Sequence, residues 1–508
     1  MQRMSRRDLF RNGAVAAGAA VVFSGEFLDL LSASPAGAAP IGGFGPLVPD
    51  PAGKLDLPEG FTYSIVARSG LWGQDPYNES FDVLDDAGHP PFPTKADGTG
   101  AFAGPKGGTI LVQNHEQDAV APGGQFLPLT PKNTGAPVYD GSATNAFGGT
   151  TNLVLDRGAN VQRRYVSLAG TIRNCAGGVA PWGAWLTCEE TESIVAGGKR
   201  HGYVFEVDAG GTRTTGEPLV GLGRYAHEAL AIDPRTSQAY LTEDASGPNG
   251  LLYRFTPTRA RGRFGDYAAG GVLDTMQAWT REGNPIDDLS QITEVGTQLR
   301  VQWVPVPIPD PDGTNASPST RKQFAYPGRS ASLAPASPDR VTRAKKFEGA
   351  FWETGAAWIV CSFTKTADLP ASVSYPALPP TVHDGQVWKY KPGNGTLTLV
   401  ALLPSHEAAD DYGTPGVFDS PDNIAVSANT GVFLAEDGEG LNHVLAVDRR
   451  GGVSAFARNR VVFHDGAEEI FREFTGPTFS HDGKFLFVSV QDPGITYAIT
   501  GPWSQARH

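Results

Sequence analysis

Cysteine is scarce in this chain, with three among 508 residues, which excludes the small disulfide-stapled scaffolds of secreted proteins. Beyond the N-terminal region no run reaches the about eighteen apolar residues that a membrane-spanning helix needs. Basic residues number 41 against 54 acidic ones, and the net charge of −13 argues against general nucleic-acid binding. No HExxH, GxSxG, P-loop or Rossmann fingerprint stands in a suitable context, so the chemistries that they support are not indicated.

The N-terminus has the composition of an export signal. Arg6 and Arg7 precede the apolar run AVAAGAAVVF, and Ala36-Gly37-Ala38 offers an A-x-A cleavage site. We expect residues 1–38 to be a twin-arginine signal peptide and residues 39–508 to be one β-propeller domain. The twin-arginine export machinery carries folded proteins, so the mature protein is expected to be periplasmic or secreted, with neither nucleic acid nor membrane as a partner.

Helical periodicity is almost absent after Gly60. In its place are strand-length runs rich in β-branched and aromatic residues and bounded by Gly, Pro, Asn and Asp, among them TILVQ, GYVFEVD, LLYRF and KFLFVSVQ. Many short strands with regular turn signals predict an all-β fold.

Several of these runs repeat one pattern: a short strand, a polar or glycine turn, and a more apolar second strand. Examples are EALAIDPRTSQAYLTED, DNIAVSANTGVFLAED and, in a shortened version, NCAGGVAPWGAWLTCEE. The first position of a unit and the end of its second strand lie about fourteen residues apart, which places both near one edge of a hairpin. Radially arranged hairpins bring these edges to one end of a central channel. We predict a six-bladed β-propeller with loop insertions whose axis gathers Cys175, Glu189, Glu190, Glu228, Glu243, Glu348, Asp422 and Glu436.

Acidic residues that converge on one axis repel one another unless they are paired or bound to cations. The local sequence offers few basic partners, of which Arg224 and Arg343 are the best placed. Calcium or ferric iron, which bind oxygen ligands, would answer that repulsion directly. We therefore predict a central metal cluster; structural calcium without catalysis is the alternative.

The cysteines differ in their place within the repeat. Cys175 stands where other units carry acids, whereas Cys188 lies one residue before the glutamates, so strand alternation turns it to the opposite side. Cys361 has the equivalent place in AWIVCSF. We interpret Cys175 as a thiolate ligand and Cys188 as a packing residue; a disulfide between them, which export would permit, is the alternative.

The stretches NCAGGVAPWGAWLTCEE, GRYAHEA, YLTEDAS, KFEGAFW and FTGPTFSHDGKFLFVSVQDPG resemble the PhoX-type alkaline phosphatases, which are bacterial proteins exported by the twin-arginine route. The resemblance spans most of the mature chain. It implies a six-bladed propeller with a cluster of Fe3+ and Ca2+ that hydrolyses phosphate monoesters at alkaline pH. It further implies that Cys175 binds iron and that Glu189, Glu190 and Glu243 are cluster ligands, with contributions from Glu228, Glu348 and Asp422.

One stretch departs from that family. Many members carry Arg-Pro-Glu at the start of a later unit, where the Arg is thought to hold the phosphate; here the stretch reads FDSPDNIAV, with Ser420 in place of the Arg. A serine cannot match phosphate oxygens bidentately. Arg224 and Lys365 are the candidates to supply the missing catalytic charge. The alternatives are a calcium-dependent propeller hydrolase acting on phosphodiesters or lactones, and a non-catalytic exported propeller that binds a partner on its loops.

Overall fold

The computed structural model describes residues 43–69, 93–118, 135–141, 146–194, 198–325, 339–369, 378–406, 416–465 and 468–504. In these ranges the chain forms short antiparallel strands and 3-10 turns, and it contains no α-helix. No helix of this part of the chain is long and apolar enough to cross a membrane. The all-β prediction is confirmed, while the predicted signal peptide, residues 1–38, lies outside the described residues.

The strands pair in antiparallel units, each of which begins with a strand at a sheet edge. The first unit holds β4 (Ala96–Ala103), β5 (Thr109–His115), β6 (Gly148–Leu155) and β7 (Val161–Thr171), and the second holds β8 (Asn174–Ala180), β9 (Ala184–Glu189) and β10 (Val204–Asp208). The third holds β11 (His227–Ile232), β12 (Ala239–Glu243), β13 (Gly250–Pro257) and β14 (Gly271–Trp279), and the fourth holds β18 (Phe347–Glu353), β19 (Ala356–Cys361), β20 (Gly385–Lys391) and β21 (Thr396–Leu403).

Two further units include strands from the start of the described chain. One holds β22 (Pro421–Ser427), β23 (Gly431–Glu436), β24 (His443–Val447) and β25 (Val453–Asn459), extended by β2 (Leu55–Pro58) and β1 (Leu47–Val48). The other holds β28 (Phe474–Phe479), β29 (Leu486–Val490) and β30 (Ile495–Thr500), and β3 (Thr62–Arg68) pairs with β30. Pairing of an early strand with the last one closes the ring, and β3 becomes the outer strand of that sheet.

Short elements connect these units. β16 (Gln298–Pro305) pairs with β14 on one side and with β21 on the other, so the third and fourth units form one continuous 11-stranded sheet. β15 (Pro285–Ile286) and β17 (Arg343–Ala344) pair with β14 and β13, and β26 (Val462–Asp465) pairs with β27 (Glu468–Phe471). The predicted loop insertions, around residues 133–147 and 317–340, lie partly outside the described residues.

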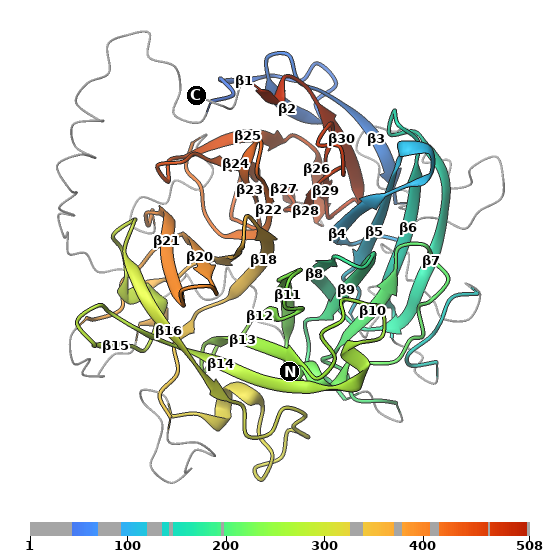
Figure 1. The fold of residues 1–508 in the computed structure, drawn as a ribbon. Helices are drawn as coiled ribbons and strands as arrows, with labels where there is room; N and C mark the ends of the chain where they lie inside the picture. Colours follow the sequence, from blue (N-terminus) through green and yellow to red (C-terminus); the bar gives the residue numbers. More distant parts are fainter. Residues whose placement is uncertain are drawn as a thin grey trace, which may run out of the picture.

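Six strands line the middle of the ring: β4, β8, β11, β18, β22 and β28, called here the inner strands. Each contacts the next inner strand around the ring, and β28 contacts β4. Figure 1 shows them around the centre, with the remaining strands of each unit farther out. This is a propeller-like arrangement, as predicted. Each inner strand and the strand after it form an inner hairpin, which carries residues toward the axis.

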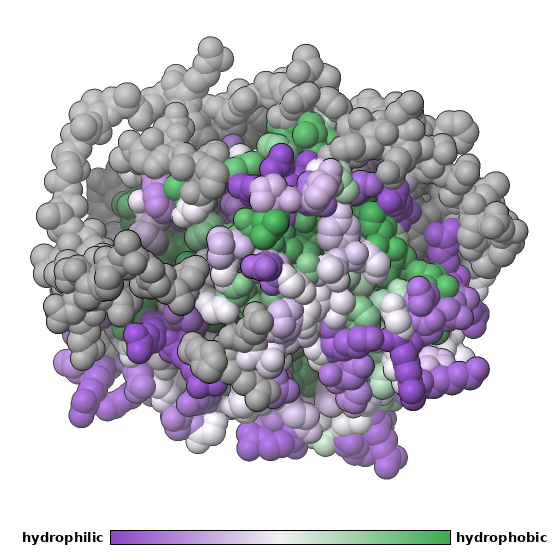
Figure 2. Space-filling model, turned by 90° about the horizontal axis from the view of Figure 1, so that it is seen from above, coloured by the Kyte–Doolittle hydropathy of each residue, from purple (hydrophilic) through white to green (hydrophobic). Residues whose placement is uncertain are grey.

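Apolar side chains fill the spaces between neighbouring sheets. One such cluster contains Leu186 and Cys188 of β9 together with Leu241 of β12 and Tyr253 of β13. In the view of Figure 2 hydrophilic residues gather along the lower and right margins of the coloured surface, and hydrophobic residues show between them and toward the middle. The prediction that Cys188 is a packing residue agrees with its place in this core.

Candidate metal centre

The inner hairpins meet the axis in a common way. In five of them the N–H after the second strand donates to the C=O before the first strand, over distances of 2.9–3.2 Å: Glu116 to Lys95, Glu190 to Arg173, Ser362 to Lys346, Asp437 to Ser420, and Gln491 to Glu473. All six pairings also shift register near the start of the inner strand. A bulge at this place re-aims the side chains at the strand start, as bulges beside active sites do.

The second residue of each inner strand belongs to what we call the deep layer. This layer consists of Asp97, Cys175, Glu228, Glu348, Asp422 and Thr475, all of them buried. The strands approach closely just beyond it, where a Cβ on Gly98 would lie 2.5 Å from the Cα of Ala176 and one on Gly476 would lie 2.4 Å from the oxygen of Asp97. Small residues at this level therefore let the deep layer converge.

The residue after the second strand of each inner hairpin belongs to what we call the upper layer. Its acids are Glu116, Glu190, Asp244 and Asp437, each of them half-buried. Glu473, which precedes β28, adds a fifth half-buried acid at the same end of the ring. The two layers together supply nine carboxyl groups and one thiol.

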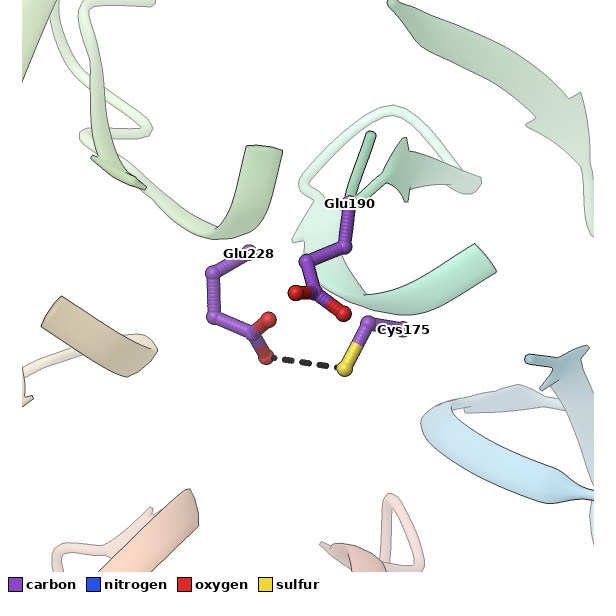
Figure 3. Close-up of side chains that lie close together, drawn as sticks. All are labelled: Cys175, Glu190 and Glu228. Carbon is purple, nitrogen blue, oxygen red and sulfur yellow. Dashed lines mark hydrogen bonds between the residues drawn. The ribbon is translucent and has the colours of Figure 1, made fainter. Parts of the chain in front are cut away.

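Ligand atoms of the two layers approach one another in three adjoining groups. The first contains Cys175, Glu190 and Glu228, the second Glu228, Glu348 and Asp422, and the third Asp422, Asp437 and Glu473; within each group one ligand atom per residue lies within 4.8 Å of the others. Figure 3 shows the three side chains of the first group pointing toward one another, with the Cys175 Sγ–H donating to Glu228 Oε1 at 3.2 Å. Because Glu228 and Asp422 are each shared by two groups, the possible metal-ligand atoms form one continuous cluster.

Burial and mutual repulsion act together on these groups. Burial, with the charges of Asp422 and Glu348, raises the pKa of Glu228 well above its usual value. Burial and neighbouring acids likewise raise the pKa of Asp97, Glu348 and Glu473, and they raise the pKa of the Cys175 thiol. Burial would also raise the pKa of Glu116, but the charges of Arg173 and Lys95 hold it below its usual value.

Three basic residues border the cluster, each directly before an inner strand. Lys346 Nζ lies 2.9 Å from Asp244 and 2.8 Å from Glu348, and Arg173 Nη2 lies 2.6 Å from Glu190. Lys95 pairs with Asp492 at 2.9 Å. These three cations have left-handed φ values of +52 to +59°, and Ser420, at the equivalent position, has φ +46°.

Nine carboxyl groups against three cations leave an excess of negative charge among the described residues of the site. Such an excess is relieved by protons or by bound metal ions. Clustered carboxylate oxygens suit hard cations such as calcium, and a thiolate beside them suits a transition metal such as iron. The residues present therefore fit a metal centre that holds several ions.

Three predicted cluster residues lie elsewhere: each is the last residue of a second strand, and its carboxylate bonds to partners outside the cluster. Glu189 accepts hydrogen bonds from the N–H groups of Ile172 and Gly202 and from His201. Glu243 accepts from Tyr253 Oη at 2.7 Å and from Arg321, and Glu436 accepts from Asp419 N and His443. The acids beside the cluster are the residues that follow them: Glu190, Asp244 and Asp437.

The predicted catalytic cations are also committed to other partners. Arg224 is buried, and its guanidinium donates to the carbonyl oxygens of His201, Pro311 and Glu192, so it joins loops. Lys365 is buried and pairs with Asp384 at 2.6 Å.

The alternative disulfide between Cys175 and Cys188 is not formed, since the three cysteines are free. Sequence reasoning missed Asp97, Glu116, Asp244, Asp437 and Glu473, as well as the bordering cations Lys95, Arg173 and Lys346. The tripeptides NHE, TED and AED were the available signal for three of these acids, since the last residue of each lies at the cluster.

The sequence matches the family of the alkaline phosphatase PhoX over residues 42–494. The chain belongs to the PhoX alkaline phosphatase family. Its fold is similar to that of PhoX from Pseudomonas fluorescens, solved in complex with vanadate, a transition state analogue, with a TM-score of 0.59 and 18% identity over 90% of this chain and 98% of that one. A gluconolactonase from Xanthomonas campestris gives a TM-score of 0.30 and 12% identity over 82% of this chain and 98% of that one. A search among curated proteins finds no match.

PhoX membership confirms the predicted family and the class of reaction. The chain is a phosphoric ester hydrolase, a phosphatase of the PhoX type. The gluconolactonase likeness is too distant to favour the lactonase alternative.

Proposed function

We propose that the deep and upper layers form a multinuclear metal centre at which an exported, six-bladed propeller hydrolyses phosphate monoesters. The observation that supports this most strongly is the chain of three adjoining ligand groups, which share Glu228 and Asp422. Cys175, the single thiol among these ligands, belongs to the first of the three groups, at one end of the row. We assign iron to the group that contains Cys175 and calcium to the groups made of carboxylates alone.

The proposed domain runs from residue 39 to residue 508, after a twin-arginine signal at residues 1–38. Arg6-Arg7 and the A-x-A site at Ala36 to Ala38 support this reading. Export of a folded chain would allow the metal centre to be loaded before the protein leaves the cytoplasm. The mature protein would then act in the periplasm or outside the cell.

The substrate's phosphoryl group would be bound beside the upper layer, where Arg173 and Lys346 border the cluster. The side chains of Arg173 and Lys346 are 25% and 19% exposed. Their guanidinium and ammonium groups would donate to phosphoryl oxygens while remaining paired with acids of the upper layer. Bound ions would supply Lewis-acid stabilisation of the phosphoryl charge and activation of water.

The protein's own residues fix this arrangement. The bulges and the hairpin-closing hydrogen bonds hold the two layers in place, and the close approach of the inner strands beneath them keeps the deep layer buried. Arg173 and Lys346 would position the phosphoryl group and compensate its charge. We assign no catalytic role to Arg224 or Lys365, because both are buried and paired.

Elemental analysis and a substrate panel test this function. Glu228→Gln removes the carboxylate shared by two groups, and we expect loss of bound metal and at least a hundredfold lower turnover of p-nitrophenyl phosphate. Glu206→Gln is the matched control, since Glu206 is a buried acid outside the cluster that bonds Trp182 and Gly265. A preparation containing calcium alone and inactive on every ester would favour the structural-calcium alternative, whereas preferential cleavage of diesters or lactones would favour another propeller hydrolase.

A further inference from the structure

The residue immediately before each upper-layer acid follows a rule within this chain. Where the upper layer carries an acid, the preceding residue is a buried polar side chain: His115, Glu189, Glu243 or Glu436. Where the upper layer carries Ser362 or Gln491 instead, the preceding residue is Cys361 or Val490. The polar residues thus occur only in the four inner hairpins that deliver an upper-layer acid.

His115 and Glu189 tie together three parts of their own units. The Nδ1–H of His115 donates to the carbonyl oxygen of Thr94 at 3.1 Å, and its Nε2 accepts from Thr151 of β6 at 2.8 Å. Glu189 Oε1 accepts from Ile172 N at 2.9 Å, and its Oε2 accepts from Gly202 N at 2.8 Å, just before β10. Thr94 and Ile172 occupy equivalent places, two residues before an inner strand.

Glu436 repeats this arrangement. Its Oε1 accepts from Asp419 N at 3.0 Å, and Asp419 also lies two residues before an inner strand. Its Oε2 accepts from both the N–H and the Nδ1–H of His443, the first residue of β24, at 2.8 Å. Three units therefore use one clamp, which joins the segment before the inner strand, the end of the second strand and the third strand.

Glu243 is a variant of the same clamp. It accepts from Tyr253 Oη at 2.7 Å and from Leu251 N at 3.2 Å, both on β13, so it holds the second and third strands together. Arg321, whose Nη1 lies 3.1 Å from Glu243, takes the place of the donor before the inner strand.

We propose that His115, Glu189, Glu243 and Glu436 are positioning residues that hold the upper-layer acids Glu116, Glu190, Asp244 and Asp437 against the metal centre. This inference rests on the proposed function, because it requires the cluster to bind metal. Each clamp residue is next to its acid in the chain, so immobilising one fixes the backbone that carries the other. The like charges of the cluster push an upper-layer acid toward water, against the ion pairs that Arg173 and Lys346 make with three of these acids. Outer partners that orient metal ligands typically change affinity 10- to 100-fold.

Glu436 and Val490 give a matched pair of test positions, since both end the second strand of an inner hairpin and both are buried. Glu436→Leu removes the clamp, Glu436→Gln keeps one oxygen acceptor, and Val490→Ala loosens packing at the equivalent place. The readouts are bound metal per chain and the Ca2+ concentration at the midpoint of thermal stabilisation, measured on the whole mature chain.

We expect Glu436→Leu to raise the Ca2+ midpoint 10- to 100-fold and Glu436→Gln to raise it by a smaller factor. Val490→Ala should leave the midpoint within about twofold of the unmodified chain, although substitutions at both positions should lower the melting temperature in EDTA.

Equal midpoints for Glu436→Leu and Val490→Ala would overturn the proposal. Should Glu436→Leu fail to fold, an unchanged midpoint in Glu436→Gln would overturn it as well. An unmodified chain that binds no metal would refute the proposed function and this inference together, whereas a metal-binding chain with unaffected clamp variants would refute this inference alone.

Discussion

Removing bound metal should leave a pH-dependent deficit in stability, and Asp422 sets its direction. Burial, together with the charge of Asp437, raises the pKa of Asp422 from 3.8 to about 7, against the opposing charge of Lys346. Asp244 and Glu116 also face this carboxyl group and raise its pKa. A carboxyl group whose pKa is raised by folding contributes stability that is present at low pH. That stability is lost as the pH rises from the unfolded value toward about 7.

Metal ions compete with this proton. Below pH 7 the protonation of Asp422 penalises metal binding by about 1.36 kcal/mol per pH unit. At pH 5.5 the penalty from Asp422 alone is therefore about 2 kcal/mol, and at pH 8 it is close to zero. The raised pKa values of Asp97, Glu190, Glu228, Glu348 and Glu473 act in the same direction.

Calorimetry of metal-loaded and chelated protein at the two pH values measures this effect. An unfolding entropy of about 2 cal/mol/K per residue gives roughly 1 kcal/mol per degree for 508 residues. The gain in melting temperature on metal binding should thus be at least about 2 °C larger at pH 8 than at pH 5.5. Buried histidines with lowered pKa values also destabilise the fold at pH 5.5, but they act on both forms and cancel in the difference. A gain that is equal at both pH values, or larger at pH 5.5, would refute the reasoning.

Further predictions concern single side chains. Cys175→Ser should strip iron and any thiolate-to-iron absorption, while Cys188→Ser should only lower the melting temperature; a Cys175–Cys188 bridge in non-reduced peptides would contradict this. Lys346→Met should lower kcat/KM for p-nitrophenyl phosphate about 10- to 100-fold through loss of a charged contact, and an unchanged value would remove Lys346 from the site. Ser420→Arg should raise monoesterase activity more than diesterase activity, since Arg173 already holds the same left-handed conformation at the equivalent position; equal effects on both substrates would count against a phosphate contact there.

The sequence pattern predicted the inner hairpins better than it predicted which of their residues reach the axis. Spacing alone identified the second residue of four inner strands, because an acid or a cysteine stands at the start of each of these repeats. These residues are Cys175, Glu228, Glu348 and Asp422. It missed Asp97, whose unit has no recognisable first half in KADGTG. The bulges that re-aim these residues leave no mark in the composition, since they depend on how neighbouring inner strands approach one another.

At the end of the second strand, the sequence pattern chose the residue before the acid that lies at the cluster. This shift by one residue has a physical cause. In CEE, TED and AED two consecutive acids must point to opposite sides, and period-two alternation does not say which one faces the axis. The choice is made by the hydrogen bond that closes the hairpin, for example from Glu190 N to Arg173 O, which places the second acid beyond the end of the ladder. The first acid then accepts hydrogen bonds from backbone N–H groups of its own unit. The two consecutive acids therefore have different partners: the first bonds to partners outside the cluster and the second lies at the candidate metal centre, and only the fold determines which is which.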